Sequence, residues 1–216
     1  MLKAVNLTKK YGELEILKGI SLEVNAGEIV SIVGSSGAGK TTLLQILGTL
    51  DRPDDGTFTI DGINPFTLSQ RELANFRNRM IGFVFQFHQL LPEFDALENI
   101  MIPAMIQGIS KKDAREKAFS LLEKVGLQDR ASHRPNEISG GEQQRIAVCR
   151  ALVNQPNIVF ADEPSGNLDT RNANELHELF FKLREELNQT FVIVTHNQHL
   201  AKQADRMLQM QDGLMV

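Results

Sequence analysis

The sequence predicts an α/β fold with a mostly parallel sheet flanked by helices, antiparallel strands near the N-terminus and an inserted helical subdomain. Three observations support this prediction. Short apolar runs rich in Val and Ile or Phe lie at 29–33, 158–161 and 191–194, each followed by Gly or polar residues. Such runs are typical of buried central strands in a parallel sheet. Residues 88–155 have mostly helical spacing, and a glycine-rich segment joins the first apolar run to a helix.

Length and composition limit the class of protein. The chain has 216 residues, 42% hydrophobic and 23% charged, which suits one globular domain with a subdomain inserted. A net charge of −4 argues against nucleic acid as a partner, because phosphate binding favours a basic chain. The single cysteine, Cys149, cannot form an internal disulfide. With no secretory leader and no membrane-spanning run expected, we predict a cytoplasmic protein.

The remaining elements follow in chain order. Alternating or apolar patterns predict further strands at 19–25, 57–60 and 81–85, with a turn at Asp61-Gly62 after the second. Apolar residues at helical spacing predict helices at 41–47, 113–125, 141–153 and 172–187. The C-terminal segment 206–216 reads as a hairpin that turns at Asp212-Gly213.

These elements suggest how a single domain, 1–216, is divided. Segments 1–86 and 156–216 contain all the predicted strands and are expected to form the core. Segment 87–155 is expected to form the helical subdomain between them. The chain has no internal repeat, low-complexity segment or long linker.

The glycine-rich segment fits the phosphate-binding pattern G-x-x-x-x-G-K-[ST] in full. Its eight residues are Gly34, Ser35, Ser36, Gly37, Ala38, Gly39, Lys40 and Thr41. It follows a predicted strand and opens a predicted helix, so its N–H groups and the helix N-terminus can surround an anion. Lys40 can reach the β- and γ-phosphates, Thr41 can ligate Mg²⁺, and Thr42 adds a hydroxyl near the α-phosphate. The segment therefore predicts a nucleotide phosphate site.

Two carboxylates end the second apolar run. Asp162 suits the Mg²⁺ shell and Glu163 suits a general base that polarises the attacking water. His196, after the third run, is placed to hydrogen-bond a γ-phosphate. Gln86, after the strand at 81–85, is either a sensor of metal and water or an ordinary strand-exit glutamine. The other four histidines are expected to have no role at the site: His88, His133, His177 and His199.

A second anion-binding helix start is predicted about 100 residues after the first. Its residues are Ser139, Gly140, Gly141, Glu142 and Gln143, followed by a helical pattern. One nucleotide does not need two such helix ends. A head-to-tail dimer, in which each chain's second segment caps the γ-phosphate held by the other, would use both. On the residues alone, a plain helix N-cap explains the segment equally well.

Together these motifs resemble the ABC-type ATPase cassette over essentially the whole chain. The order matches the family: phosphate loop, Gln86, the signature at 139–143, Asp162-Glu163, the segment 165–169 and His196. Tyr11, the only tyrosine, matches the family's adenine-stacking aromatic residue. Two departures are mild, because Ile138 stands for the usual leucine and Glu142 is present where many members continue directly to glutamine.

The resemblance implies a P-loop NTPase of the ABC type that hydrolyses ATP with Mg²⁺ and works as a homodimer. In the family, ATP joins two cassettes, and an integral membrane partner converts their closing into movement. By matching position, Ser36–Thr42 hold phosphates and Mg²⁺, Gln86 contacts Mg²⁺ or water, and Glu163 is the base. The segment Ser139–Gly141 caps the opposite ATP, His196 clamps the γ-phosphate and Asp169 links the two chains.

Within the family, the runs 87–99 and 161–169 resemble the lipoprotein-releasing (LolD-like) cassettes. Lipoprotein release from the inner membrane is the expected function, with peripheral attachment to the cytoplasmic face. MacB-like peptide or antibiotic exporters and FtsE-like cell-division complexes are the alternatives. A soluble non-transport ABC ATPase is disfavoured, because the chain has neither a long coiled-coil insertion nor tandem cassettes. Apolar residues at 87–102 form either a groove for the membrane partner's helix or internal core.

Overall fold

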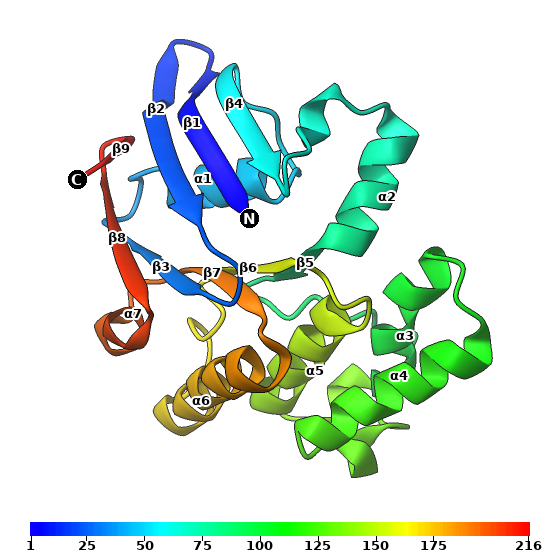
Figure 1. Cartoon of the computed structure of the whole chain (residues 1–216). Helices are drawn as coiled ribbons and strands as arrows, with labels where there is room; N and C mark the ends of the chain where they lie inside the picture. Colours follow the sequence, from blue (N-terminus) through cyan, green and yellow to red (C-terminus); the bar gives the residue numbers. More distant parts are fainter.

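The computed structural model describes all residues 1–216. Figure 1 shows an antiparallel sheet above a mostly parallel one, with helix α1 between them and further helices below. This arrangement agrees with the α/β fold predicted from the sequence.

The antiparallel sheet has the strand order β2-β1-β4. Its strands are β1 (Leu2–Tyr11), β2 (Leu14–Val24) and β4 (Asp55–Ile60). Sequence patterns predict β4 and the second half of β2 but not β1. Register shifts interrupt the pairing of β1 with β2 at three places, which obscures the alternation of buried and exposed residues that marks a strand.

The second sheet has the strand order β5-β6-β7-β3-β8-β9. Its strands are β3 (Ile29–Val33), β5 (Ile81–Val84), β6 (Ile158–Asp162), β7 (Thr190–Val194), β8 (Arg206–Gln211) and β9 (Leu214–Met215). All pairs are parallel except β8 with β9, which form the predicted C-terminal hairpin. The three apolar runs are the central strands, and β3 and β7 are buried along their full lengths.

Helices cover both faces of the parallel sheet. They are α1 (Lys40–Leu47), α2 (Gln70–Met80), α6 (Thr170–Leu187) and α7 (Gln198–Gln203). Helix α1 lies between the sheets and contributes four buried residues to a cluster that includes side chains from both. The predicted helices at 41–47 and 172–187 correspond to α1 and α6, whereas α2 and the short α7 were not predicted.

The helical part of the chain has a hydrophobic cluster of its own, with buried members from Leu90 to Val153. Its helices are α3 (Ala96–Ile106), α4 (Lys111–Lys124) and α5 (Gly140–Leu152). Short 3₁₀ turns lie at Gln128–Arg130 and Pro135–Glu137, and a third lies in the core at Pro65–Thr67. Helix α5 also packs against β5 and α6, so it joins the helical part to the core.

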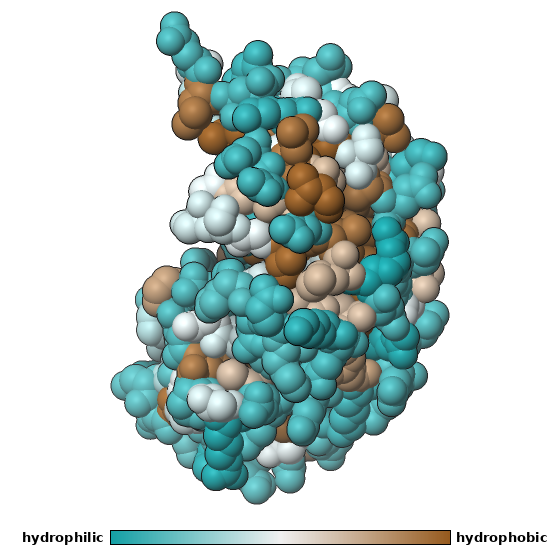
Figure 2. Space-filling view, turned by 90° about the vertical axis from the view of Figure 1, so that its left-hand side faces the viewer, coloured by the Kyte–Doolittle hydropathy of each residue, from teal (hydrophilic) through white to brown (hydrophobic).

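Hydropathy is distributed unevenly over the surface. On the side shown in Figure 2, hydrophobic residues gather in the upper half, at the height of the sheets, and the lower half is mostly hydrophilic. None of the helices combines the length and the apolar character needed to cross a membrane.

Phe180 of α6 provides a test of the core. It is fully buried and packs edge-on against Phe191 of β7, with ring centroids 5.1 Å apart. We expect Phe180→Ala to lower the free energy of unfolding by about 3–5 kcal/mol, because it removes buried surface and leaves a cavity. Phe87→Ala, at a ring that is 65% exposed, should change it by no more than about 0.5 kcal/mol. If Phe180→Ala and Phe87→Ala lowered the free energy of urea unfolding equally, this packing would be contradicted.

Candidate active site

The glycine-rich loop joins β3 to α1, as predicted. Its backbone is tightly constrained, because a Cβ atom on Gly34 would lie 2.1 Å from the carbonyl oxygen of Met210. Gly37 and Gly39 adopt positive φ angles of 80° and 98°, a conformation that favours glycine. The Lys40 ammonium folds back and donates to the carbonyl oxygens of Gly34 and Ser35 at 2.8 and 2.9 Å. A positive side chain is thus held over a loop that ends in a helix N-terminus.

Parallel pairing of β3, β6 and β7 brings the predicted carboxylates to this loop. Thr41 Oγ1 lies 3.4 Å from Asp162 Oδ1, although the two residues are 121 positions apart. Burial raises the pKa of Asp162; the Thr41 hydrogen bond opposes this shift, and the Glu163 carboxylate adds to it. A site with two neighbouring carboxylates favours a cation that compensates their charge.

Glu163 is held in an unusual backbone conformation. Its φ angle is +46°, and its N–H donates to the carbonyl of Val194 on β7 at 2.9 Å. Its Oε2 atom lies 2.8 Å from His196 Nδ1 and accepts the His196 backbone N–H at 3.2 Å. A non-glycine residue with positive φ costs free energy and persists only where surrounding contacts enforce it. The fold therefore fixes the position of this carboxylate beside the imidazole.

The glycine-rich loop, Glu163 and His196 line one cavity of about 520 Å³, which Asp162 adjoins through Thr41. Its lining includes Ser36, Lys40, Thr41, Thr42, Gln86, Glu163 and His196, together with Gly34, Gly37 and Gly39. Gln86 does not lie free in this cavity. Its side-chain Nε2 donates to Asn167 Oδ1 at 3.2 Å, and its backbone carbonyl accepts from Asn167 Nδ2 at 3.4 Å. Asn167 lies in the segment 165–169 that matches the family, in which only Asp169 is assigned a role from the sequence.

The segment at the start of α5 forms a complete N-terminal cap. Ser139 accepts the Glu142 N–H at 3.3 Å, and Glu142 Oε2 accepts the N–H and hydroxyl of Ser139 at 2.8 and 2.7 Å. Arg130 donates to the other oxygen of Glu142 at 2.9 Å. Gln143 donates to the carbonyls of Pro135 and Ile138. The side chains of Glu142 and Gln143 are thus occupied within the chain, while Ser139 and Gly140 remain exposed.

Within one chain, the capped segment and the phosphate loop do not share a cavity. The predicted residues outside the lining of the 520 Å³ cavity are Tyr11, Ser35, Ala38, Ser139, Gly140, Gly141, Glu142, Gln143, Asp162 and Asp169. Gly141 packs so closely on Asn172 that a Cβ atom would lie 2.1 Å from its Oδ1 atom. Asn172 in turn donates to Asp169, the N-cap of α6, through its backbone N–H at 3.0 Å and its amide at 2.6 Å.

His177, for which no role at the site is predicted, contacts the segment that follows Glu163. It is 3% exposed on α6, and its Nε2 atom lies 2.9 Å from the hydroxyl of Ser165. Burial lowers the pKa of His177, with a smaller contribution from His199, which favours the neutral ring. No local sequence signal reveals this contact, because a histidine on the apolar face of a helix looks like an ordinary core residue.

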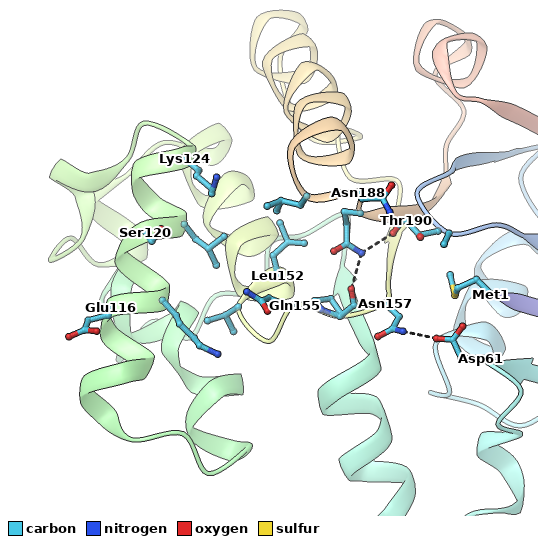
Figure 3. A pocket seen from close by; sticks show the side chains of 17 residues that line it. Met1, Asp61, Glu116, Ser120, Lys124, Leu152, Gln155, Asn157, Asn188 and Thr190 are labelled. Atoms are coloured by element: carbon cyan, nitrogen blue, oxygen red, sulfur yellow. Dashed lines mark hydrogen bonds between the residues drawn. The ribbon is translucent and has the colours of Figure 1, made fainter.

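A larger cavity, of about 720 Å³, lies elsewhere, between α4, the segment before β6 and the start of β7 (Figure 3). Glu116, Ser120 and Lys124 line it from α4, opposite Gln155 and Asn188. None of the predicted site residues lines this cavity. The candidate active site is therefore the smaller cavity, where the motif residues meet.

The donor atoms in the smaller cavity suit a nucleotide and Mg²⁺. The Thr41 hydroxyl, the adjoining Asp162 carboxylate and the Gln86 amide are hard oxygen ligands of the kind that Mg²⁺ prefers. The structure contains no cluster of three or more His, Cys, Asp or Glu residues that would hold a metal alone. Sparse protein ligation is typical of Mg²⁺ that is shared with substrate phosphates.

Comparison with known proteins gives close matches over the whole chain. A family model described as ABC transporter matches residues 17–166. The lipoprotein-releasing system ATP-binding protein LolD of Bacteroides thetaiotaomicron is 63% identical and covers 99% of this chain and 98% of its own length. The protein of the same name from Bacteroides fragilis is 60% identical over 100% of both chains.

A solved structure has the same fold. The ATP-binding cassette MJ0796, in a dimeric post-hydrolysis state bound to ADP and Pi, superposes with a TM-score of 0.90. It is 40% identical in sequence and covers 100% of this chain and 96% of its own.

The capped segment makes stability depend on pH. Burial alone would raise the pKa of Glu142, but the Ser139 hydrogen bonds and Arg130 outweigh it and lower the pKa from 4.5 to about 2. The ionised carboxylate therefore stabilises the fold fully above pH 4.5, and this stabilisation is lost as the pH falls toward 2. We expect Glu142→Gln to lower the free energy of unfolding at neutral pH.

Urea unfolding from about pH 7 to about pH 3 measures this effect. The difference between the native chain and Glu142→Gln should shrink below pH 4.5, whereas Glu116→Gln, on the exposed side of α4, should show little difference throughout. A Glu142→Gln difference that is independent of pH would contradict the assignment.

Proposed function

This chain belongs to the ABC transporter family, and on that premise we propose that it is the ATP-hydrolysing subunit of a lipoprotein-releasing system. The observation that carries the proposal is the cavity where the phosphate loop meets Gln86, Glu163 and His196. The choice of system is supported by relatives that are named for lipoprotein release and match nearly the full length of the chain.

In this proposal the phosphate loop binds the triphosphate of ATP. Lys40 exchanges its two carbonyl partners for β- and γ-phosphate oxygens, and the loop N–H groups from Ser36 to Thr42 surround the same phosphates. Mg²⁺, when bound, would neutralise phosphate charge. Thr41, Gln86 and Asp162 would hold it, and Gln86 must then release Asn167.

Glu163 is the proposed general base. A carboxylate held by backbone contacts is positioned to accept a proton from the attacking water. His196, which pairs with Glu163 in this structure, would instead donate to the γ-phosphate when ATP is bound. The pair would thereby keep Glu163 away from water until the substrate arrives.

The exposed Ser139 and Gly140 support a site shared between two chains. They lie at the N-terminus of α5, outside the cavity of their own chain, and a helix N-terminus attracts anions. In a C2 dimer, each chain's Ser139–Gly141 would cap the γ-phosphate held by its partner, and Asp169 would join the two chains. The relative MJ0796, whose structure is a dimer bound to ADP and Pi, supports this arrangement.

A partly apolar groove between the core and the helical part is the proposed docking site for the membrane partner. Its cavity of about 380 Å³ is lined by Leu50, Phe83, Phe85, Pro103 and Ile106, with Arg77 and Arg150 among its polar members. Ile106, 71% exposed, also lines an adjoining cavity of about 440 Å³ with Phe94, Ile102 and Met105. We assign the groove to a short cytoplasmic helix of the partner, with apolar residues facing the groove and acidic residues facing the arginines.

The segment 87–102 is neither wholly buried core nor wholly surface. Leu90 is buried within the helical cluster, whereas Phe87, Leu91 and Phe94 are exposed. Docking through the exposed residues would hold the chain peripherally on the cytoplasmic face of the inner membrane. Release of lipoproteins would then follow from closing of the two cassettes.

Glu163→Gln tests the catalytic assignment. It keeps the size of the side chain but removes the base, so we expect retained ATP binding and hydrolysis slower by roughly 10²–10⁴. Phosphate release and nucleotide titration measure the two effects separately. Lys40→Ala is the matched contrast, because it should weaken binding itself. Hydrolysis at the native rate by Glu163→Gln would remove this residue from the mechanism.

Ile106→Glu tests the docking groove and the system together. A charge at this exposed apolar position should prevent the chain from joining its membrane partner, because it replaces an apolar contact and would have to lose its hydration in the interface. Leu187→Glu is the control, at an exposed leucine that lines the 720 Å³ cavity instead.

The measurement is ATP-dependent release of a fluorescent lipoprotein from liposomes that contain the co-purified partner. Release should occur with the native chain and with Leu187→Glu but not with Ile106→Glu. Release by Ile106→Glu would contradict the groove, and no release by the native complex would contradict the choice of system.

A further inference from the structure

The ring of Tyr11 is fixed by a group of charged residues that no motif includes. Tyr11 and Lys9 lie two residues apart on β1, and both side chains contact Asp51. The Tyr11 hydroxyl donates to Asp51 Oδ2 at 2.6 Å, and Lys9 Nζ donates to Asp51 Oδ1 at 3.0 Å. The same ammonium lies 5.2 Å from the centroid of the Tyr11 ring. One carboxylate and one ammonium thus hold the ring at its tip and at its face.

Lys9 is unusually well enclosed for a lysine, since only 8% of it is exposed. Its ammonium also donates to the carbonyl of Arg52 at 2.6 Å and lies 3.9 Å from Asp54. A buried ammonium needs such partners, because desolvation without them is costly. Tyr11, by contrast, is 48% exposed. The buried lysine therefore provides a rigid support for a ring that remains open to a ligand.

Asp51 also ties this group to the helix that begins at the phosphate loop. The Asp51 backbone N–H donates to the carbonyl of Gln45, near the end of α1, at 3.2 Å. Helix α1 starts with Lys40, directly after the loop glycines. The ring and the phosphate loop consequently share one rigid element, which sets the distance between them.

We propose that Asp51 and Lys9 are positioning residues for the base of the bound nucleotide, because they fix the Tyr11 ring as a stacking platform at a set distance from the phosphate loop. This inference rests on the proposed function, in which Tyr11 stacks on adenine. An aromatic ring that is already fixed loses less conformational freedom when a base stacks on it, so more of the stacking energy appears as affinity. Lys9 adds a cation–π contact that holds the ring from its face.

The composition of the chain makes this group measurable by spectroscopy. The chain has one tyrosine and no tryptophan, so its tyrosinate absorbance reports on Tyr11 alone. The hydrogen bond to Asp51 raises the pKa of Tyr11 above its ordinary value of 10.0, and burial and the charge of Asp51 act in the same direction. Removing the carboxylate should therefore lower the pKa of Tyr11 toward 10.0.

The test compares MgATP with inorganic tripolyphosphate, which has the phosphates but no base. Asp51→Ala should weaken MgATP binding roughly 2- to 10-fold, the range of one hydrogen bond, and leave tripolyphosphate binding unchanged. Tyr11→Phe deletes only the hydroxyl that contacts Asp51 and should give a similar loss of MgATP affinity. This variant replaces Asp51→Ala in the test if Asp51→Ala folds poorly. Asp55→Ala is the matched control, because the side chain of Asp55 accepts a hydrogen bond only from the neighbouring Gly56 N–H.

A double-mutant cycle separates positioning from a general structural role. If Asp51 acts through the Tyr11 hydroxyl, the Tyr11→Phe/Asp51→Ala chain should bind MgATP as weakly as either single variant. Tyr11→Ala, which removes the platform, should weaken MgATP binding roughly 5- to 100-fold. Additive losses in the cycle, equal losses for tripolyphosphate, or an unshifted tyrosinate titration in Asp51→Ala would overturn the proposal.

One outcome separates this inference from the proposed function. If Tyr11→Ala binds MgATP normally, the platform is wrong. The ATPase assignment is then still tested separately, by nucleotide binding of Lys40→Ala and by hydrolysis by Glu163→Gln.

Discussion

Parallel pairing of β3, β6 and β7 places Asp162 and Glu163 at the same sheet edge as a loop shaped to hold a polyanion. The Asp162 and Glu163 carboxylates and a bound triphosphate would repel one another unless cations and dipoles compensate their charge. Lys40 and the N-terminus of α1 supply part of this compensation from within the chain. Mg²⁺ and the exposed helix start at Ser139 of a second chain would supply the rest. In the proposed function, the charge balance of the site would explain why both Mg²⁺ and a second chain are needed.

The structure explains why local sequence patterns identify some parts of the molecule and miss others. Fully buried strands such as β3 and β7 are visible as apolar runs, and the phosphate loop is visible because its glycines are required by φ angles and close contacts. Strand β1 was missed because register shifts disturb its alternation and it carries a buried lysine. Contacts between distant side chains, such as Tyr11 with Asp51 and Ser165 with His177, depend on packing that no local pattern records.

The side chains around the cavity suggest how its parts respond together. Gln86 is paired with Asn167, which lies in the segment between Glu163 and Asp169. Gln144 and Arg150 of α5 donate to the carbonyls of Phe85, His88 and Gln89. The helix that begins at Ser139 is therefore joined to the loop that begins at Gln86, beside the proposed docking groove. In the proposed dimer, α5 begins at the segment that caps the nucleotide of the other chain. Capping of that nucleotide and movement of the membrane partner would therefore both act on α5.

Activity of mixed dimers measures the shared site most directly. In the proposed mechanism, Lys40→Ala chains lack the phosphate-binding lysine and Ser139→Arg chains block the capping segment, so neither homodimer would retain an intact site. A mixed dimer combines Lys40 of one chain with Ser139 of the other in one complete site. The account predicts that mixing restores ATP hydrolysis that neither variant shows alone. Mixed dimers verified by mass that remain inactive would contradict it.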